Sequence, residues 1–184
     1  MRLSNQAVCA LALAAVLVIT GCNLVGTGLT RVPPRAAPSG TWTDEAGHPL
    51  ALASFRRAPL VMSAFFTSCT VRCPMTVEKL KAVDRAYQAS GTAVSIVVLA
   101  LDPKNDTPDR LARFKRDHGL SDNWHFLWGS MNETRKLAKY LSVNPAYDDG
   151  HIDHDVEIAV FDAYGRLARS YGGWAFDPKD AVVR

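Results

Sequence analysis

The stretch AFFTSCTVRCPMTVEKL, residues 64–80, carries two cysteines at a point where one sequence pattern gives way to another. The run LVMSAFF that leads into it is short and apolar, as is typical of a strand buried inside a sheet. After Pro74, apolar residues recur at helical spacing until a glycine stops the pattern. We therefore expect Cys69 and Cys73 at a strand-to-helix transition, as a structural disulfide, a redox pair or a metal clamp.

Working outward, strand-like and helix-like segments alternate along the chain. The strand-like runs are LVMSAFF, AVSIVVLALD, HFLWG, EIAVFD and RLARSYG, and the helix-like runs are MTVEKLKAVDRAYQAS, TPDRLARFKRDHG and NETRKLAKYL. The last two strands are separated only by the turn AYG, which predicts an antiparallel pair. Residues 41–55 predict an N-terminal hairpin with Gly47 in its turn. The pattern predicts an α/β sandwich in which helices flank a mixed central sheet.

The N-terminus predicts export and anchoring. Arg2 precedes an apolar run of 14 residues, the length of a signal-peptide core and short for a membrane span. The run ends in ITGC, which resembles the lipobox of bacterial lipoproteins and makes Cys22 the lipidated residue. An ordinary secretory signal is the alternative. We expect a lipoprotein signal peptide at 1–21, a flexible tether at 22–40 and one domain at 41–184, on the extracytoplasmic (periplasmic) side of a membrane.

The cysteine count limits the number of free thiols, and the net charge limits the class of partner. Removal of the signal peptide takes Cys9 away and the lipid consumes Cys22, so Cys69 and Cys73 are the only thiols left in an oxidising compartment. The formal net charge is +3 with no long run of like charges, so nothing in the sequence requires a nucleic acid partner.

The position of the pair favours reactivity over inert packing. A helix N-terminus offers free N–H groups and partial positive charge, both of which favour the thiolate. Two thiolates are an incomplete set for a mononuclear metal site, and thiolate with imidazole selects copper or zinc. Among the five histidines, His151 and His154 lie in a polar segment that runs into the strand EIAVFD. Each of these two histidines, taken alone, is better explained as a solvated loop residue.

Three motifs together resemble a known family. FFTSCTVRCP, LDPKNDTPDRL and DHDVEIAVFDAYGRL are similar, in order and spacing, to the SCO/SenC family of copper proteins that assist assembly of cytochrome c oxidase. The resemblance implies a thioredoxin-like fold and one copper held by Cys69, Cys73 and His154. It matches Asp153 to an acidic residue that orients the imidazole or lies near the metal. Thr70 replaces the usual proline, and the short end after Trp174 predicts a truncated or frayed terminus.

Two functions follow as expectations. The first is a membrane-anchored metallochaperone that delivers copper to, or prepares, the copper-bearing subunit of cytochrome c oxidase, with other periplasmic copper or thiol-redox proteins as partners. The second is a thiol–disulfide oxidoreductase that reduces client cysteines with Cys69 and Cys73. A peroxiredoxin-type peroxidase is disfavoured because Phe66 occupies the position where that family's motif needs proline. A purely structural disulfide would leave Pro74 and His154 unexplained.

Overall fold

The computed structural model describes residues 39–149 and 151–184. The expected signal peptide, Cys22 and nearly all of the tether lie outside these residues. In the described part of the chain, no helix has the length and apolar character needed to cross a membrane. The helices are α1 Arg72–Ala89, α2 Pro108–Asp117 and α3 Met131–Tyr140, with short 3₁₀ helices η1 Leu52–Phe55 and η2 Pro178–Ala181. The strands are β1 Trp42–Thr43, β2 Pro49–Leu50, β3 Leu60–Phe65, β4 Ser95–Ala100, β5 Trp124–Leu127, β6 Ala146–Asp148, β7 His151–Asp153, β8 Glu157–Phe161 and β9 Leu167–Gly172.

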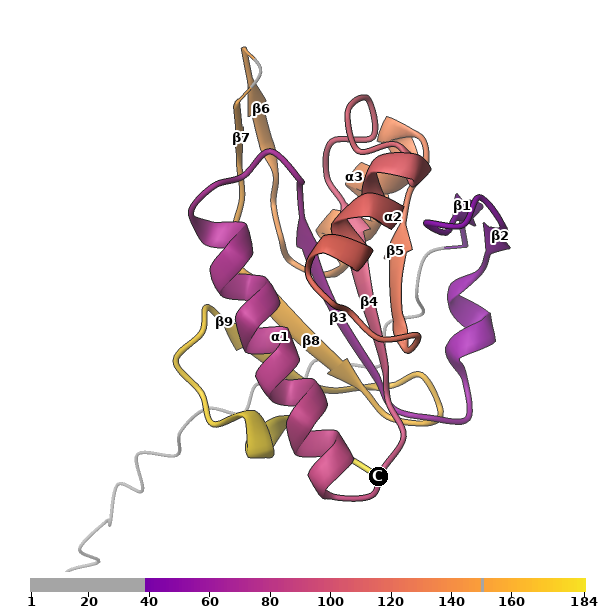
Figure 1. The fold of residues 1–184 in the computed structure, drawn as a ribbon, viewed down its shortest axis with the longest axis vertical. Coiled ribbons are helices and arrows are strands. Elements are labelled where there is room, and N and C mark those ends of the chain that lie inside the picture. The colour runs from indigo at the N-terminus through magenta and orange to yellow at the C-terminus, as the bar shows by residue number, and fades with distance from the viewer. Residues whose placement is uncertain (1–38, 150) are drawn as a thin grey trace, which may run out of the picture. The chain divides into compact units, whose positions relative to one another are not determined.

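A five-stranded mixed sheet forms the centre of the fold, in the order β5-β4-β3-β8-β9 (Figure 1). Strands β3, β4 and β5 run parallel, whereas β8 pairs antiparallel with both β3 and β9. The β1–β2 hairpin forms as expected, and Gly47 adopts a φ of 84° in its turn. The arrangement confirms the α/β sandwich with a mixed sheet and N-terminal hairpin, in the thioredoxin-like form.

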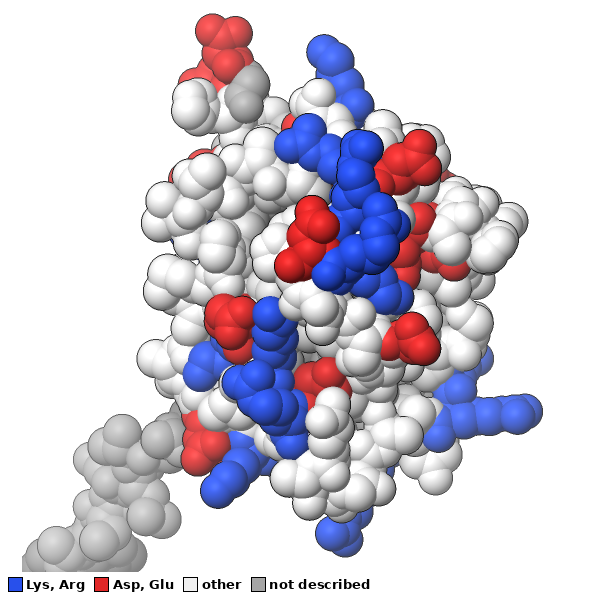
Figure 2. Space-filling view, in the orientation of Figure 1, with Lys and Arg blue, Asp and Glu red and all other residues white. Residues whose placement is uncertain are grey.

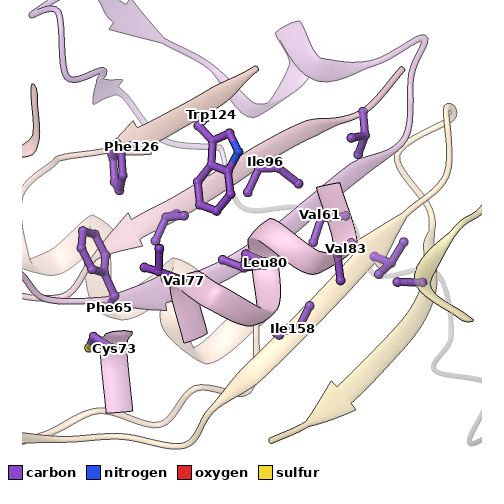
Figure 3. Packing of buried hydrophobic residues seen from close by; sticks show 14 of the residues in the cluster. Val61, Phe65, Cys73, Val77, Leu80, Val83, Ile96, Trp124, Phe126 and Ile158 are labelled. Atoms are coloured by element: carbon purple, nitrogen blue, oxygen red, sulfur yellow. The ribbon is translucent and has the colours of Figure 1, made fainter. Parts of the chain in front are cut away.

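The two faces of the sheet bury separate apolar cores, because successive strand residues point to opposite faces. On one face, Val61 and Phe65 of β3 pack with Val77, Leu80 and other residues of α1; Figure 3 shows this layer with Cys73 at its edge. On the other face, alternate residues of the same strands pack with α3 and Trp42. The central strands are thus buried on both sides, which explains their unbroken apolar runs.

The segment between α3 and β8 differs from the expectation of a polar loop. It forms the β6–β7 hairpin, in which Asp148 pairs with His151 and Ala146 pairs with Asp153. Tyr147 fixes the hairpin to the sheet, since its hydroxyl donates to the carbonyl of Leu101 at 3.0 Å. The hairpin ends one residue before His154, so that histidine is placed by a strand end.

The C-terminal segment is docked on α1, and the expectation of a frayed end was wrong. Ala181 in η2 is fully buried, and its carbonyl accepts a hydrogen bond from the hydroxyl of Tyr87 at 2.8 Å. The same hydroxyl accepts from the backbone N–H of Val183 at 3.1 Å, and the ammonium of Lys79 donates to the carbonyl of Phe176 at 2.9 Å. Figure 1 shows this segment beside α1. Residues 176–183 thus cover one face of α1 without forming a full helix of their own.

Candidate metal and thiol site

The two cysteines occupy the β3–α1 connection, as the sequence predicts. Strand β3 ends at Phe65 and α1 begins at Arg72, so Cys69 lies in the loop and Cys73 in the first helical turn. Pro74 follows within the same turn, where its missing N–H costs no helical hydrogen bond. The backbone N–H of Cys73 donates to Sγ of Cys69 at 3.3 Å, and both residues are free thiols in this structure.

The two thiols have opposite electrostatic environments. Partial burial alone would raise the pKa of Cys69, but hydrogen bonds from the Cys73 thiol and from the N–H groups of residues 71–73 outweigh it, and the net pKa is lowered. Cys73 is only 2% exposed, and burial raises its pKa far above the ordinary value. The expectation of two activated thiolates is therefore right for Cys69 alone.

His154 follows β7 and is 6% exposed. Its Nδ1 lies 2.8 Å from the backbone carbonyl of Asp155, and because a carbonyl can only accept, Nδ1 carries the proton. The other nitrogen, Nε2, is buried and has no hydrogen-bond partner in the described part of the chain. Burial lowers the pKa of the imidazole, so the ring is neutral and Nε2 presents an unshared lone pair.

Two residues connect the histidine to the cysteine loop. The guanidinium of Arg72, between the two cysteines in sequence, donates to Oδ1 of Asp153 at 2.9 Å and to the carbonyl of His154 at 3.3 Å. The ring of Phe66 meets the His154 imidazole edge-on, with centroids 6.0 Å apart. The carbonyl of Phe66 also accepts from the N–H of Cys69 at 3.1 Å. Asp153 does not hydrogen bond to the imidazole; the backbone of Asp155 orients the ring, and Asp153 acts through Arg72.

The structure brings the thiols together and joins the histidine side to them, without closing the three into one cluster. Within residues 39–149 and 151–184, no group of three or more His, Cys, Asp or Glu side chains is arranged to hold a metal ion. The donors themselves suit a soft metal, since the set combines two sulfurs with one neutral imidazole nitrogen that lacks a partner.

A buried carboxylate supports the loop from the other side. Oδ1 of Asp106 accepts from the backbone N–H of Thr67 at 3.0 Å and from the hydroxyl of Thr67. Asp106 is 1% exposed, its Oδ2 has no partner among the described residues, and burial raises its pKa. This residue is the second aspartate of the DPKNDTP motif, so the motif fixes the start of the cysteine loop.

Sequence reasoning missed Arg72, although a signal was present. It is the only charged residue between Ala58 and Val77, and a lone charge in an apolar segment needs a partner. Figure 2 shows the charged surface in the orientation of Figure 1. Basic side chains over α2 alternate with acidic ones, and the exposed tip of the β6–β7 hairpin is acidic through Asp148 and Asp149.

The chain is similar in sequence and in fold to several known proteins. The chain is 26% identical over 149 residues to the SCO1 protein homolog of Bacillus subtilis (strain 168), covering 78% of this chain and 77% of that protein. Its fold is similar to a SCO1/SenC family lipoprotein from Bacillus anthracis str. Ames, with a TM-score of 0.74 at 20% identity over 83% of this chain and 94% of that one. It is also similar to Arabidopsis thaliana ScoI with copper bound, with a TM-score of 0.71 at 19% identity over 80% and 93% of the two chains. The family model described as SCO1/SenC matches residues 33–183, and the chain therefore belongs to the SCO1/SenC family.

Proposed function

We propose that this protein is a membrane-anchored metallochaperone that carries one copper ion as cargo. Cys69, Cys73 and His154 would hold the ion and pass it to, or prepare, the copper site of cytochrome c oxidase. Two findings support this assignment: the chain is similar to BsSco, a member of the Sco family of cytochrome c oxidase assembly proteins, and to Arabidopsis ScoI, whose structure has copper bound.

The observation that carries the proposal is the buried, unpartnered Nε2 of His154. A buried nitrogen without a hydrogen bond is costly, and such a cost persists where the group has another use. Because the Asp155 carbonyl fixes the proton on Nδ1, the lone pair of Nε2 is free to bind a metal without any change of tautomer. Phe66 contacts both parts of the site, since its ring meets the imidazole and its carbonyl accepts from the N–H of Cys69.

Transfer requires a site that can open. Two sulfurs and one nitrogen leave a coordination position for a ligand of the partner, so ligands could exchange one at a time. Thiolate ligation requires a reduced pair, so copper loading and a Cys69–Cys73 disulfide exclude one another. The exposed Arg72–Asp153 ion pair, with side-chain exposures of 54% and 81%, leaves the His154 side adjustable while the thiols stay packed on α1.

Anchoring is part of the same proposal. The signal peptide at 1–21, lipid on Cys22 and a tether to residue 40 would hold domain 41–184 on the extracytoplasmic side of the membrane. Similarity to the Bacillus anthracis lipoprotein supports it. Expression of the full chain with Cys22→Ser should release the protein from the membrane fraction, whereas the unaltered chain should remain there and gain the mass of the lipid.

A second function is favoured by the unequal thiols. In thiol–disulfide exchange, the Cys69 thiolate would attack a client disulfide, forming a mixed disulfide and releasing one client thiolate. Cys73 would then lose its proton and attack Cys69, releasing the second client thiolate and leaving a Cys69–Cys73 disulfide. The client gains two electrons, and an extracytoplasmic dithiol reductant would have to restore the pair. The lowered pKa of Cys69 suits the attacking role.

Anaerobic copper titration of the reduced chain tests the first function. We expect one copper ion per chain, loss of binding in the double variant Cys69→Ser/Cys73→Ser, and at least about tenfold weaker binding in His154→Ala. His151→Ala, which alters an exposed histidine of the same hairpin, is the matched control and should bind as the parent does. Equal copper binding by all variants, or by none, would exclude the metallochaperone and leave reduction of client disulfides to be assayed.

A further inference from the structure

A hollow in the surface lies at the end of the sheet opposite the thiols. It has a volume of about 380 Å³, and its floor is formed by Leu60, Met62 and Phe161. Leu60 is the first residue of β3 and pairs with Phe161, the last residue of β8. The cysteine loop leaves the other end of β3, which six residues place roughly 20 Å away. The hollow, which we call the distal groove, is therefore separate from the candidate metal site.

The distal groove is built to receive apolar material. Its walls include the rings of Trp42, Phe55 and Tyr140. Of the two charged groups on its rim, Asp162 is already paired with Arg166 at 2.8 Å, and Arg56 is exposed. Contiguous apolar and aromatic lining of this kind marks a place where something binds.

The chain itself enters the domain through this groove. Ser39 and Gly40, the first described residues, are part of its lining. A side chain at position 40 would meet the Trp42 ring at 2.4 Å, so only glycine lets the backbone pass so closely over the indole. The seven residues that precede Ser39 in the sequence, 32–38, read VPPRAAP.

From these observations we infer that Val32–Pro38 binds in the distal groove of its own domain. Three prolines favour an extended polyproline conformation, which loses little entropy on binding and packs well against aromatic rings. At about 3.1 Å per residue the extended segment spans roughly 22 Å. Covalent connection at Ser39 gives it an effective concentration on the order of millimolar at the groove.

Docking there would orient the thiol site. The chain would be held at the end of β3 opposite the cysteine loop, so the thiols would face away from the point at which the tether leaves the domain. Together with the proposed anchor at Cys22, only residues 23–31 would remain as a free linker. The inference about the groove rests on the domain alone, whereas this consequence rests on the proposed anchoring.

Limited trypsin digestion of the chain from residue 23 tests the docking, because the tether contains two arginines. The Arg31–Val32 bond lies at the N-terminal edge of the docked segment, and the Arg35–Ala36 bond lies within it. In a synthetic peptide of residues 27–42, the two rates give the intrinsic ratio of Arg35–Ala36 to Arg31–Val32 cleavage. In the protein we expect this ratio to be at least about tenfold lower, because only chains whose segment has left the groove are cut at Arg35–Ala36.

Three variants locate the protection. Ala53 is an exposed residue of the groove wall, and Ala53→Trp should fill the groove and abolish the protection. Ala168→Trp places the same bulk on exposed β9, outside the groove, and should leave it intact. Pro33→Gly/Pro34→Gly changes only the segment proposed to dock and should weaken the protection.

Four outcomes would overturn the inference. The first is an unprotected Arg35–Ala36 bond in the parent, and the second is protection that rises with protein concentration and so points to a second copy. The third is protection that survives Ala53→Trp, and the fourth is a loss of protection in Ala168→Trp equal to that in Ala53→Trp. Copper binding does not enter this measurement, so the inference and the proposed function can fail independently.

Discussion

The two sides of the thiol site are built from parts of different strength. The cysteine side lies between a fully buried six-residue strand and the first turn of an 18-residue helix, and Cys73 belongs to the apolar core itself. The histidine side lies between the small β6–β7 hairpin and β8. It contacts the cysteine side through the ring of Phe66 and the guanidinium of Arg72.

This difference suggests a division of labour within one site. Elements with many buried contacts open only with the whole domain, whereas peripheral hairpins move at lower cost. The positions of the thiols are therefore set by the fold, and the approach of the imidazole is set by a few contacts near the surface. Changes on the cysteine side should therefore have large effects on the properties of the site, and changes on the histidine side should have smaller, graded effects.

The largest expected effect is a difference in alkylation between the two thiols. In the reduced, metal-free chain, Cys69 should react with iodoacetamide at least about 100-fold faster than Cys73, because the thiolate is the nucleophile and Cys73 is both buried and protonated. The lowered pKa of Cys69 should keep its reaction fast at pH values where a free thiol, with a pKa of 9.0, is slow.

Peptide mapping by mass spectrometry after timed quenching measures both rates in one sample. Alkylation of the protein unfolded in urea is the control, since the two thiols should then react at similar rates. Equal rates in the folded protein would mean that Cys73 is as accessible as Cys69, and would contradict the contrast between a buried and a partly exposed thiol.

The inequality of the thiols was readable in the sequence. Cys73 lies four residues before Val77 and seven before Leu80, which is the spacing of one helix face, and both of those residues are in the core. The strand-to-helix transition, the buried strands β3 and β4 and the apolar face of α1 followed from the same periodicity. These features depend on neighbours close in sequence.

Other features depend on partners far away in the chain and carry no local signal. Arg72 meets Asp153 across 81 positions, and Tyr87 meets Ala181 across 94. Each strand of the β6–β7 hairpin has only three residues, which is too short for its alternation of exposed and half-buried positions to stand out in the sequence. The carbonyl that orients His154 belongs to the backbone of Asp155, and side-chain motifs do not reveal backbone acceptors.

A smaller effect is expected in the pH dependence of stability. Burial lowers the pKa of His154 below its unfolded value of 6.5, so below that pH the unfolded chain binds a proton that the folded chain does not. Stability should therefore fall as the pH drops below about 6.5, with a slope of up to about 1.4 kcal/mol per pH unit for one such group. His154→Gln should remove its share of this slope.

Urea unfolding of the metal-free chain between pH 5 and pH 8 measures the slope. His125, which is half-buried and whose pKa burial also lowers, provides the comparison, because His125→Gln should remove a separate and additive share. A His154→Gln variant with the full parental slope would show that the imidazole is not held neutral by burial.

The smallest effect is expected from Arg72, and it is the one that tests the adjustable side directly. The Arg72–Asp153 pair is largely exposed, so Arg72→Ala should change the free energy of unfolding by less than about 1 kcal/mol. Because the same guanidinium holds the carbonyl of His154, copper affinity should still fall by roughly threefold to tenfold, with partial recovery in Arg72→Lys. Arg85→Ala removes an equal charge from an exposed position on the same helix and should not alter the affinity.

Competition with a chromophoric copper chelator measures each affinity. Since Arg72 acts here through position as well as charge, its effect should persist in 0.5 M salt, whereas a purely electrostatic contribution would be screened.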